Sequence, residues 1–588
     1  MKLYKLSLAL FLGFGAMSMT SCEDKLEVTN PNEQTTGTFG FTSDDLEECV
    51  IAAYHDLRME GSTGRVGYTI DAVRGDEVWN SSQVWYMPFD DMNDPVTDEI
   101  SFWPWREYYY AINVCNFILS RTTGDNAQLS ESMKRIKGQA LFIRGFAYYN
   151  LVGYYKDVPL ITDYSTYSSL DGLYGANNTS DEVLDQAEKD LKEAMELLPN
   201  RQAGGEWAKG RATCGAAAGY YARTLMFRHK YSEALEVLKD IIGGTKYGKY
   251  KLMANYGDNF REGSAYENND ESLFEVQYLD YGTQGVDDEW TPVNVSPNAT
   301  QGHAVESNFA PGDFGGWADL SASPWLYNLF KEERTTAGKL DPRLYWTLGT
   351  YEKEWEGFEN GNVAYTKKIT ATDTLRTNNN YGGIPIAKWT NMRTGLYSSV
   401  ATGLRCGINL RMMRYSDVLL RAAECENEVN GPTEQAIKWI NEVRQRAGLA
   451  DLKLEDFNTK DKLFEQIANV ERPKEFGCEN GRGMDLIRWG FFYDNGRLDQ
   501  LKEHGTFYKN KTIDVKTPVT YAQTKTDPEN VKSSYDTYLP GHEFLPIFQT
   551  LLNNNPNLKG NSANDGIDNS TDFFGRGWTV HPVVDLSK

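Results

Sequence analysis

The sequence predicts a mostly helical protein made of paired antiparallel helices, with an irregular lobe that contains short strands. Three observations support this class. Apolar residues recur at helical spacing in two separate parts of the chain, and helix-capping residues precede several of these stretches. The region between the two parts loses the helical period and becomes rich in Gly, Asn, Trp and Tyr. At 588 residues the chain exceeds what one core of ordinary size can fill, because single cores stop growing at about 250–300 residues.

Residues 43–242 are expected to form the first helical hairpins, with an aromatic-rich loop at 71–100. In the stretch 43–59 the apolar residues fall on one helical face, and Ser43 is available as its N-cap. Another helix is expected from Pro104, because proline fits the first turn of a helix and apolar residues follow it at helical spacing. These stretches predict one helix before the aromatic loop and one helix after it.

The next helices are expected to form the centre of the scaffold. The second half of residues 130–155 is apolar nearly all round, which is typical of a buried helix. Thr179 and Glu182 make a capping box in front of another amphipathic helix. The pair 210–227 and 231–242 has small Ala and Gly residues in its first member, so two antiparallel helices can approach closely. This pattern predicts a hairpin of the tetratricopeptide type.

The second half of the chain contains the irregular lobe and one more hairpin. Residues 243–410 are expected to form a loop-rich lobe that binds ligand, with a strand-like piece at 272–277. Residues 411–490 contain the last hairpin, whose second helix ends at Gly448 in the position that favours glycine. Residues 491–588 are loop-rich and are expected to pack on the scaffold.

The N-terminus has the pattern of a bacterial lipoprotein signal. Residues 1–21 combine a positively charged start, a short apolar run and small residues before Cys22, so we expect a signal peptide that is removed. The run is too short for a membrane span, which needs about 20 apolar residues. A lipid on Cys22 would then anchor the mature chain through a tether, residues 22–42. A plain secretory signal that happens to end near a cysteine is the alternative.

The charge excludes several classes of partner. The formal net charge is −23, and it becomes more negative when Lys2 and Lys5 leave with the signal peptide. No Lys/Arg-rich run is present, so neither nucleic acid nor an anionic membrane surface is an expected partner. The six His residues are scattered and the six cysteines after Cys22 form no CxxC pair, so we expect buried thiols, no metal and no cofactor, although a stray disulfide stays open.

Aromatic residues indicate where a ligand would bind. They make up 13% of the chain, and 35 of them are Tyr. Most belong to the core, but rigid Trp and Tyr side chains also offer flat apolar faces to the C–H groups of a sugar. Amides and carboxylates beside such rings would hydrogen-bond the hydroxyl groups. An excess of aromatic residues outside periodic helices therefore favours glycan binding.

Two aromatic clusters lie outside any helical or strand period. The first falls between the first two helices and is predicted to be an exposed loop. Its candidate ligand-binding residues are Trp79, Trp85 and Tyr86, with Asn80, Gln83, Asp71 and Arg74 as polar candidates. The second cluster falls in the irregular lobe and contributes Trp290, Trp317 and Asp319. Trp325 is interpreted as structural, because apolar residues follow it at helical spacing.

At this point the sequence resembles the SusD-like (RagB/SusD) family of glycan-binding lipoproteins over almost its whole length. The blocks that carry the resemblance are Trp105 to Asn116, Gly138 to Tyr148, Asp157 to Leu160, Gly210 to Ala212, Arg414 to Glu424, Ile440 to Leu449, Glu471 to Trp489, and Phe544 to Leu558. The sequence departs from the family pattern at Pro473, Asn480 and Phe548. These departures affect the local geometry expected at helix ends and loops, and they do not argue against membership of the family.

The resemblance implies a fold, a site and a partner. The fold would be a curved scaffold of four tetratricopeptide-like hairpins with an irregular lobe on one side. Ligand contacts would come from loops in the two aromatic regions, which together could form one platform for an oligosaccharide. The partner would be a SusC-like TonB-dependent transporter that the lipoprotein covers as a lid, and the acidic pair Glu23 and Asp24 resembles a surface-export signal that would place the protein outside the cell.

Charged residues of the family blocks are expected to be architectural. We interpret them as ion pairs and helix caps that tie the last hairpin to the core, not as a catalytic cluster. They are Arg444, Arg446, Glu471, Arg482, Asp485 and Arg488.

Three classes of function stay open on the sequence. The favoured one is a protein that binds an oligosaccharide without catalysis and delivers it to a transporter. A glycoside hydrolase would need two carboxylates across the scissile bond, and with 83 acidic residues the sequence alone neither identifies nor excludes such a pair. A surface protein that binds peptides or a protein partner is the third class.

Overall fold

The structure is a computed structural model. It describes residues 42–80, 83–168, 174–279, 302–350, 352, 354, 384–393, 404–508 and 531–587. The signal peptide, Cys22, most of the tether and Trp290 lie outside these residues.

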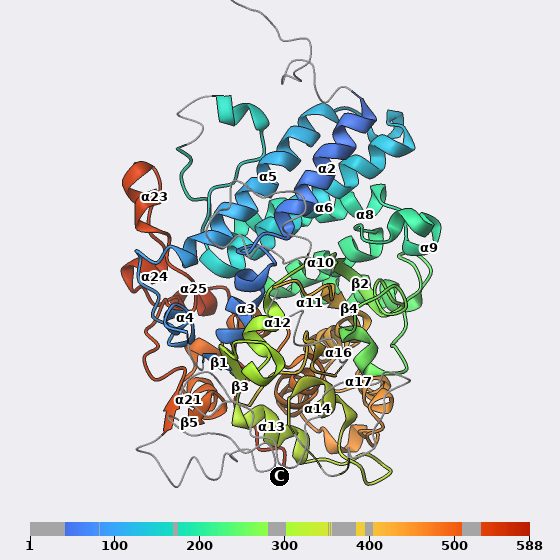
Figure 1. Cartoon of the computed structure of the whole chain (residues 1–588), viewed down its shortest axis with the longest axis vertical. Coiled ribbons are helices and arrows are strands. Elements are labelled where there is room, and N and C mark those ends of the chain that lie inside the picture. Colours follow the sequence, from blue (N-terminus) through green and yellow to red (C-terminus); the bar gives the residue numbers. More distant parts are fainter. Residues whose placement is uncertain are drawn as a thin grey trace, which may run out of the picture.

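Eight helices form the scaffold, and the predicted mostly helical class is confirmed. Each helix packs against the next one in the series, so the four consecutive pairs make an array of hairpins. In Figure 1 the array runs from α2, α5 and α6 at the top of the molecule to α16 and α17 lower down. The eight helices are α2 Ser43–Leu57, α5 Trp103–Arg121, α6 Glu131–Tyr155, α8 Ser180–Leu197, α10 Cys214–Phe227, α11 Tyr231–Gly243, α16 Tyr415–Asn430 and α17 Glu434–Arg446.

Capping residues set the helix ends, and one predicted cap is shifted. Thr42, rather than Ser43, is the N-cap of α2, because its side chain accepts the Asp45 N–H and Asp45 returns the contact. Thr179 and Glu182 make the predicted capping box of α8. Gly448 follows α17 with a φ of 75°, a conformation that glycine adopts without strain.

Helix α6 is the centre of the scaffold. All residues from Gly138 to Tyr155 are buried, as its lack of a polar face predicts. Small residues permit this packing, because a Cβ at Gly145 would lie 2.8 Å from the Leu191 side chain of α8. The N-terminal hairpins are therefore held together around one continuous apolar core.

Outside the eight scaffold helices, the described residues form short helices and three two-stranded antiparallel sheets. The strands pair as β1 with β3, β2 with β4, and β5 with β6. The strands are β1 Val78–Asn80, β2 Ser272–Val276, β3 Leu320–Ala322, β4 Leu410–Arg414, β5 Thr506–Tyr508 and β6 Val531–Ser533. Strand β2 corresponds to the predicted strand-like piece, and its partner β4 leads directly into α16, which joins the lobe to the last hairpin.

Shorter helices complete the fold around this scaffold. They are α3 Arg65–Val73, α4 Met87–Asp90, α9 Arg201–Gly204, α12 Val305–Phe309, α13 Pro324–Lys331, α14 Pro342–Thr347, α18 Lys460–Gln466, α19 Arg472–Phe476, α20 Arg482–Arg488, α21 Asn495–His504, α23 Gln549–Asn554, α24 Ser562–Asp565 and α25 Ser570–Gly575. A π-helical turn, Ile467–Glu471, connects α18 to α19 just ahead of Pro473. It accommodates the proline, which lacks an N–H for the normal helical hydrogen bond.

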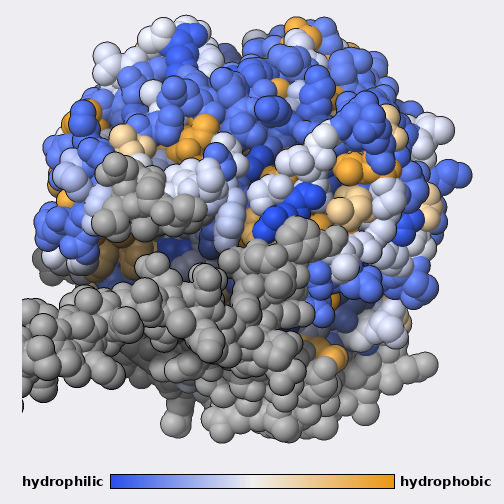
Figure 2. Space-filling view, turned by 90° about the horizontal axis from the view of Figure 1, so that it is seen from above, coloured by the Kyte–Doolittle hydropathy of each residue, from blue (hydrophilic) through white to orange (hydrophobic). Residues whose placement is uncertain are grey.

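The described part of the surface that Figure 2 presents is mostly polar. Seen from above, its coloured residues are mostly hydrophilic, and hydrophobic residues occur among them as separate spots. Within the described ranges, no helix combines the length and the apolar character that crossing a membrane requires. The six cysteines from Cys49 to Cys478 are free thiols, and all except Cys49 are buried.

Candidate functional site

The two aromatic clusters of the sequence meet because of one small sheet. Strand β1 runs antiparallel to β3, with Asn80 opposite Leu320 and Val78 opposite Ala322. The chain that leaves β1 and the chain that enters β3 therefore lie at the same end of the ladder. Trp85 follows β1 and Trp317 precedes β3, so the sheet brings these two residues together from distant parts of the sequence.

Helix α12 fixes both aromatic turns. Its Asn308 side chain donates to the hydroxyl of Tyr86 at 2.8 Å, next to Trp85. Its Ser307 carbonyl accepts the backbone N–H of Trp317 at 2.6 Å. The following residue, Ala318, has a positive φ of 53° and donates its N–H to Ala310. A left-handed conformation at a residue with a side chain is unfavourable, and such strain is often found where a side chain must be held in one direction.

Trp85 and Trp317 are half-buried, and both contact Arg65. The Arg65 guanidinium carbon lies 5.3 Å from the centre of the Trp85 ring and 5.4 Å from the centre of the Trp317 ring. Both distances lie within the range of a cation–π contact. Trp85 also stacks on Tyr86, with ring centres 3.9 Å apart. Trp85 and Trp317 together form the indole pair, and Arg65 is the arginine that contacts both of its rings.

A tightly packed turn delivers Arg65 to the indole pair. Arg65 is the first residue of α3 and follows the turn 58–64. At Gly61 a Cβ would lie 2.4 Å from the backbone of Trp103, so only glycine fits against α5 there. The Glu107 carboxylate of α5 accepts the N–H of Ser62 at 2.9 Å, and the Tyr108 hydroxyl donates to the Ser62 carbonyl at 2.8 Å.

The electrostatics of this turn are those of buried, paired groups. Arg65 is 2% exposed and forms an ion pair with Glu60 at 3.3 Å. Burial raises the pKa of the Glu107 carboxyl to about 7, although Arg106 and the two backbone N–H groups oppose the shift. Burial also raises the pKa of the Tyr86 phenol well above its usual range, so that its hydroxyl stays protonated. The Arg65 guanidinium therefore interacts with the rings of Trp85 and Trp317 and with the Glu60 carboxylate in the protein interior.

The other candidates of the first cluster lie in the interior. Trp79 belongs to strand β1, is 1% exposed and stacks on Phe507 with ring centres 4.0 Å apart. Tyr86 is fully buried, and its hydroxyl is also 2.5 Å from the hydroxyl of Thr69. The Asn80 side chain is buried and exchanges hydrogen bonds with the backbone of Gln83, which is itself half-buried. The predicted exposed loop is thus replaced here by a strand and a packed turn.

The charged candidates are also structural in their contacts. Asp71 is buried and accepts backbone N–H groups from Gly481 and Met484 at the start of α20. Arg74 pairs with Asp94 at 2.7 Å. Burial raises the pKa of Asp71 to about 6.

The second cluster contributes one placed residue besides Trp317. Asp319 is 1% exposed, directly before β3. Trp290 lies outside the described residues. Trp325 of α13 stacks on His504 with ring centres 3.8 Å apart, in agreement with its interpretation as structural. Of the predicted site residues that the structure describes, Trp85, Trp317 and Gln83 are the ones that are half-buried, and the others are buried.

Sequence reasoning missed Arg65 and Glu60. Neither belongs to an aromatic cluster, and their proximity to it arises only from the turn packed against α5. The glycines of the sequence Gly61-Ser-Thr-Gly64-Arg-Val-Gly67 were the available signal. Three glycines within seven residues indicate a close backbone approach, and the arginine among them would then be held rigidly.

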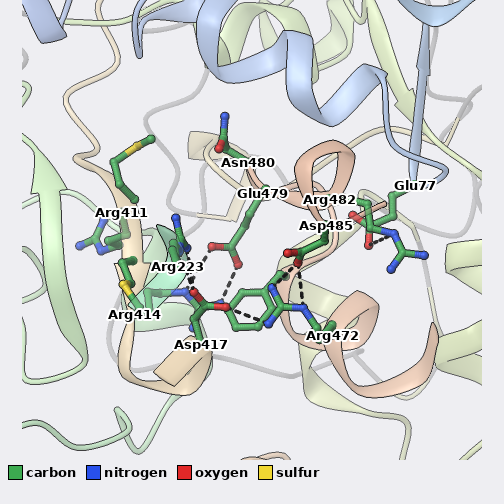
Figure 3. Close-up of a pocket in the computed structure, with 14 residues that line it drawn as sticks. Glu77, Arg223, Arg411, Arg414, Asp417, Arg472, Glu479, Asn480, Arg482 and Asp485 are labelled. Carbon is green, nitrogen blue, oxygen red and sulfur yellow. Dashed lines mark hydrogen bonds and ion pairs between the residues drawn. The ribbon is translucent and has the colours of Figure 1, made fainter. Parts of the chain in front are cut away.

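A large buried network of ion pairs lies between the lobe and the last hairpin. Asp417 of α16 accepts from Arg223 at 2.7 Å and from Arg472 at 2.8 Å (Figure 3). It also accepts from Arg421 of the same helix at 2.9 Å. Although burial opposes ionisation, these three guanidinium groups hold the pKa of Asp417 well below its usual range. Arg414 of β4 pairs with Glu479 at 2.7 Å in the same network.

The predicted structural role of the family's charged residues is confirmed. Each is buried or nearly so and engages a partner from another element. The pairs are Arg444–Glu471 at 2.6 Å, Arg446–Glu475 at 2.5 Å, Arg482–Asp76 at 2.7 Å, Asp485–Arg472 at 2.7 Å and Arg488 with Glu424 at 2.5 Å. The cavity among them holds about 30 Å³, room for about one water molecule and none for a sugar ring.

The described part of the chain contains no group of three or more His, Cys, Asp or Glu side chains arranged to hold a metal ion. The indole pair combines rings from both sequence clusters with partial exposure.

Comparisons with known proteins identify the family to which this chain belongs. Residues 270–565 match the SusD family, and residues 24–226 match a SusD-like group described as starch-binding and associating with the outer membrane. The chain therefore belongs to the SusD family, a class of outer-membrane-associated, non-catalytic glycan-binding proteins. This membership confirms the expectation that the chain is a binding protein and not an enzyme.

Individual relatives agree in length and fold. The chain is similar to a SusD-like protein of Formosa agariphila, with 25% identity over 91% of this chain and 98% of that one. It is also similar to the crystal structure of a SusD superfamily protein from Bacteroides vulgatus, with a TM-score of 0.67, 23% identity, and coverage of 90% of this chain and all of that one. A third similar structure is surface glycan-binding protein A from Bacteroides thetaiotaomicron in complex with laminarihexaose, with a TM-score of 0.62, 21% identity, and coverage of 88% and 99%.

Proposed function

We propose that this protein captures an oligosaccharide at the surface around Trp85 and Trp317 and delivers it to a SusC-like TonB-dependent transporter. In this proposal a lipid on Cys22 anchors the chain to the outer membrane, facing the cell exterior. The glycan is bound and released without bond cleavage. The observation that carries the proposal is the meeting of two half-buried indoles from distant sequence segments at one end of the β1–β3 sheet.

The indole pair suits sugar binding for physical reasons. The C–H faces of a pyranose ring pack on an aromatic ring, and an indole loses little conformational entropy when it is already held in place. Hydrogen bonds from Asn308 and Ser307 of α12 hold the two turns in this way. The exposed area is small, so we expect modest affinity for each site and selectivity that depends on the shape of the glycan.

The relatives support the choice of ligand class. The similar protein from Bacteroides thetaiotaomicron is described in complex with a glucose oligomer, laminarihexaose. Its identity to this chain is 21%, which supports a shared fold and leaves the particular glycan to experiment. The sequence of the N-terminus supports the lipid anchor, because residues 19–22 resemble a lipoprotein box.

The test measures binding of the mature chain to a broad glycan array, followed by isothermal titration with the best ligand. Trp85→Ala and Trp317→Ala should each weaken binding at least tenfold. Trp207→Ala is the matched control, because Trp207 is also a half-buried indole, with Arg135 at 4.9 Å and Arg211 at 5.5 Å from its ring centre. It lies in the turn 205–208, far from the β1–β3 sheet in the fold, and its removal should leave binding unchanged.

Each outcome bears on the proposal. Loss of binding in both site variants and retention in the control support it. Binding that is equal in all three variants contradicts the indole pair as the site. Absence of any glycan ligand, together with binding of peptides on a parallel array, would instead establish the alternative of a peptide-binding surface protein.

Delivery and anchoring need a second experiment in the cell. A TonB-dependent transporter should co-purify with the tagged wild-type chain from detergent-solubilised outer membranes. A Cys22→Ala variant should move from the membrane to the soluble fraction. Co-purification of no TonB-dependent transporter would contradict the delivery step, and membrane retention of the variant would contradict the lipid anchor.

A further inference from the structure

Arg65 contacts both rings of the indole pair and can therefore affect how the two rings are placed for ligand binding. The guanidinium lies within cation–π distance of both rings, so the two ring centres are separated by no more than the sum of 5.3 Å and 5.4 Å. The rings come from different turns, which the β1–β3 sheet and α12 hold near one another. Arg65 contacts both rings themselves, and so makes the position of one indole depend on the position of the other.

Three features hold Arg65 itself in place. It is 2% exposed, which leaves few rotamers open to a long side chain. Glu60, at 3.3 Å, pulls the guanidinium toward the turn 58–64. The Glu107 carboxylate and the Tyr108 hydroxyl of α5 hold this turn in place. A rigid element of the helical scaffold thus extends directly to the two aromatic turns.

Arginine has properties that suit this role and lysine lacks. Its planar guanidinium lies flat against an aromatic ring and donates in plane to a carboxylate at the same time. An ammonium group would keep the charge but not this geometry. A neutral side chain would remove both cation–π contacts and the ion pair with Glu60.

We propose that Arg65 is a positioning residue for ligand binding, which sets the spacing and orientation of Trp85 and Trp317 without contacting the glycan. This proposal rests on the proposed function, because it requires that the indole pair is the binding surface. It predicts that Arg65 acts through the rings. Its effect on affinity must therefore depend on whether the rings are present.

The experiment is a double-mutant cycle on glycan affinity. The ligand is the best glycan from the array, and the chains are wild type, Arg65→Met, Trp317→Phe and the double variant. Arg65→Met should weaken binding about tenfold or more, and Arg65→Lys should recover part of that loss. In the double variant the two losses should combine to less than their product, because both changes disturb the same contact.

A second pair of variants keeps the test decisive if Arg65→Met does not fold. Glu60→Gln keeps the size of the side chain and removes the charge that orients the guanidinium, so it should weaken binding severalfold. Glu354→Gln is its control, since Glu354 pairs with Arg334 on another part of the lobe. Circular dichroism and thermal unfolding should show that both variants remain folded.

The outcomes separate this inference from the proposed function. If Arg65→Met binds within twofold of wild type while Trp85→Ala loses binding, the positioning role is contradicted and the site is retained. If the losses from Arg65→Met and Trp317→Phe multiply, Arg65 acts independently of the ring and the positioning role is also contradicted. If Trp85→Ala and Trp317→Ala both bind normally, the proposed function itself fails.

Discussion

The indole of Trp79 lies parallel to the ring of Phe507, with their centres 4.0 Å apart and their planes inclined by 5°. This stack ties strand β1 to strand β5, and so connects the sheet beside the indole pair to the C-terminal part of the chain. It also shows that neighbouring tryptophans of one short segment have different tasks. Trp79 packs in the interior, and Trp85 remains partly exposed six residues later.

Removing Trp79 should therefore affect stability more than binding chemistry. Trp79→Ala deletes a fully buried indole and should lower the free energy of unfolding by about 3–5 kcal/mol. Trp85→Ala, at a half-buried position, should lower it by less than half as much. Urea unfolding followed by circular dichroism measures both. Equal losses for the two variants would contradict the difference in burial that the structure assigns to them.

The Asp417 network predicts a large effect of removing one buried charge. Asp417→Ala leaves Arg223, Arg421 and Arg472 without the carboxylate that they share, and should destabilise the protein by about 3–5 kcal/mol. Glu206→Ala breaks the exposed pair with Lys209 and should change stability by less than about 1 kcal/mol. A mild effect of Asp417→Ala in chemical denaturation would contradict the network as a structural tie.

Buried carboxyl groups predict a loss of stability as the pH rises from about 4.5 to about 8. Burial raises the pKa of Glu77 to about 8 and that of Glu306 to about 7. A carboxyl whose pKa is higher in the folded state binds more protons there than in the unfolded chain. Its contribution to stability is therefore present at low pH and is lost as the pH rises through the folded-state pKa. The free energy of unfolding should fall from about pH 4.5, where these carboxyl groups ionise in the unfolded chain, to about pH 8, and these two groups should add no further loss above that.

Glu77 offers a direct test of this pH dependence. Glu77→Gln keeps an oxygen that can accept the Cys478 N–H but removes the titration. The slope of stability between pH 6 and 8 should become flatter by up to about 1.4 kcal/mol per pH unit. Glu131→Gln, at an exposed helix start, is the control and should leave the slope unchanged. An identical slope in wild type and Glu77→Gln would mean that Glu77 is already ionised in the folded protein.

The cysteines predict selective thiol reactivity. Cys49 is half-buried, and the thiols at positions 115, 214, 406, 425 and 478 are buried. A thiol reagent should label the folded mature chain slowly at Cys49 and at none of those five, provided that Cys22 is replaced in the sample. Mass spectrometry after partial labelling identifies the site. Rapid modification of Cys115 or Cys478, whose pKa values burial raises, would contradict their position in the core.

Much of the scaffold could be predicted from the sequence because its signals are local. The capping box at Thr179 and the all-apolar second half of α6 both specify structure within a few residues. The N-cap of α2 was predicted one residue late, because Ser43 and Thr42 are equally suitable caps and only the geometry decides between them. The architectural role of the charged family residues was also predictable, since many charged residues close together in the sequence favour ion pairs.

The site was less predictable because it depends on contacts between distant segments. Residues 79–86 have no helical or strand period, so their sequence does not reveal that Trp79 belongs to a strand, whose pairing partner lies at residues 320–322. Burial of Asp71 similarly depends on α20, far along the chain. Arg65 carries no local sign of its ring contacts. Sequence patterns identified the segments that meet, and tertiary packing selected which of their side chains remain accessible.

A crystal structure of the mature chain with its best oligosaccharide from the glycan array tests the central claim most directly. The account predicts sugar rings packed on the exposed parts of Trp85 and Trp317, with Arg65 still between those indoles and the turn 58–64. A bound sugar on another face of the molecule, with both indoles uncovered by ligand, would contradict it.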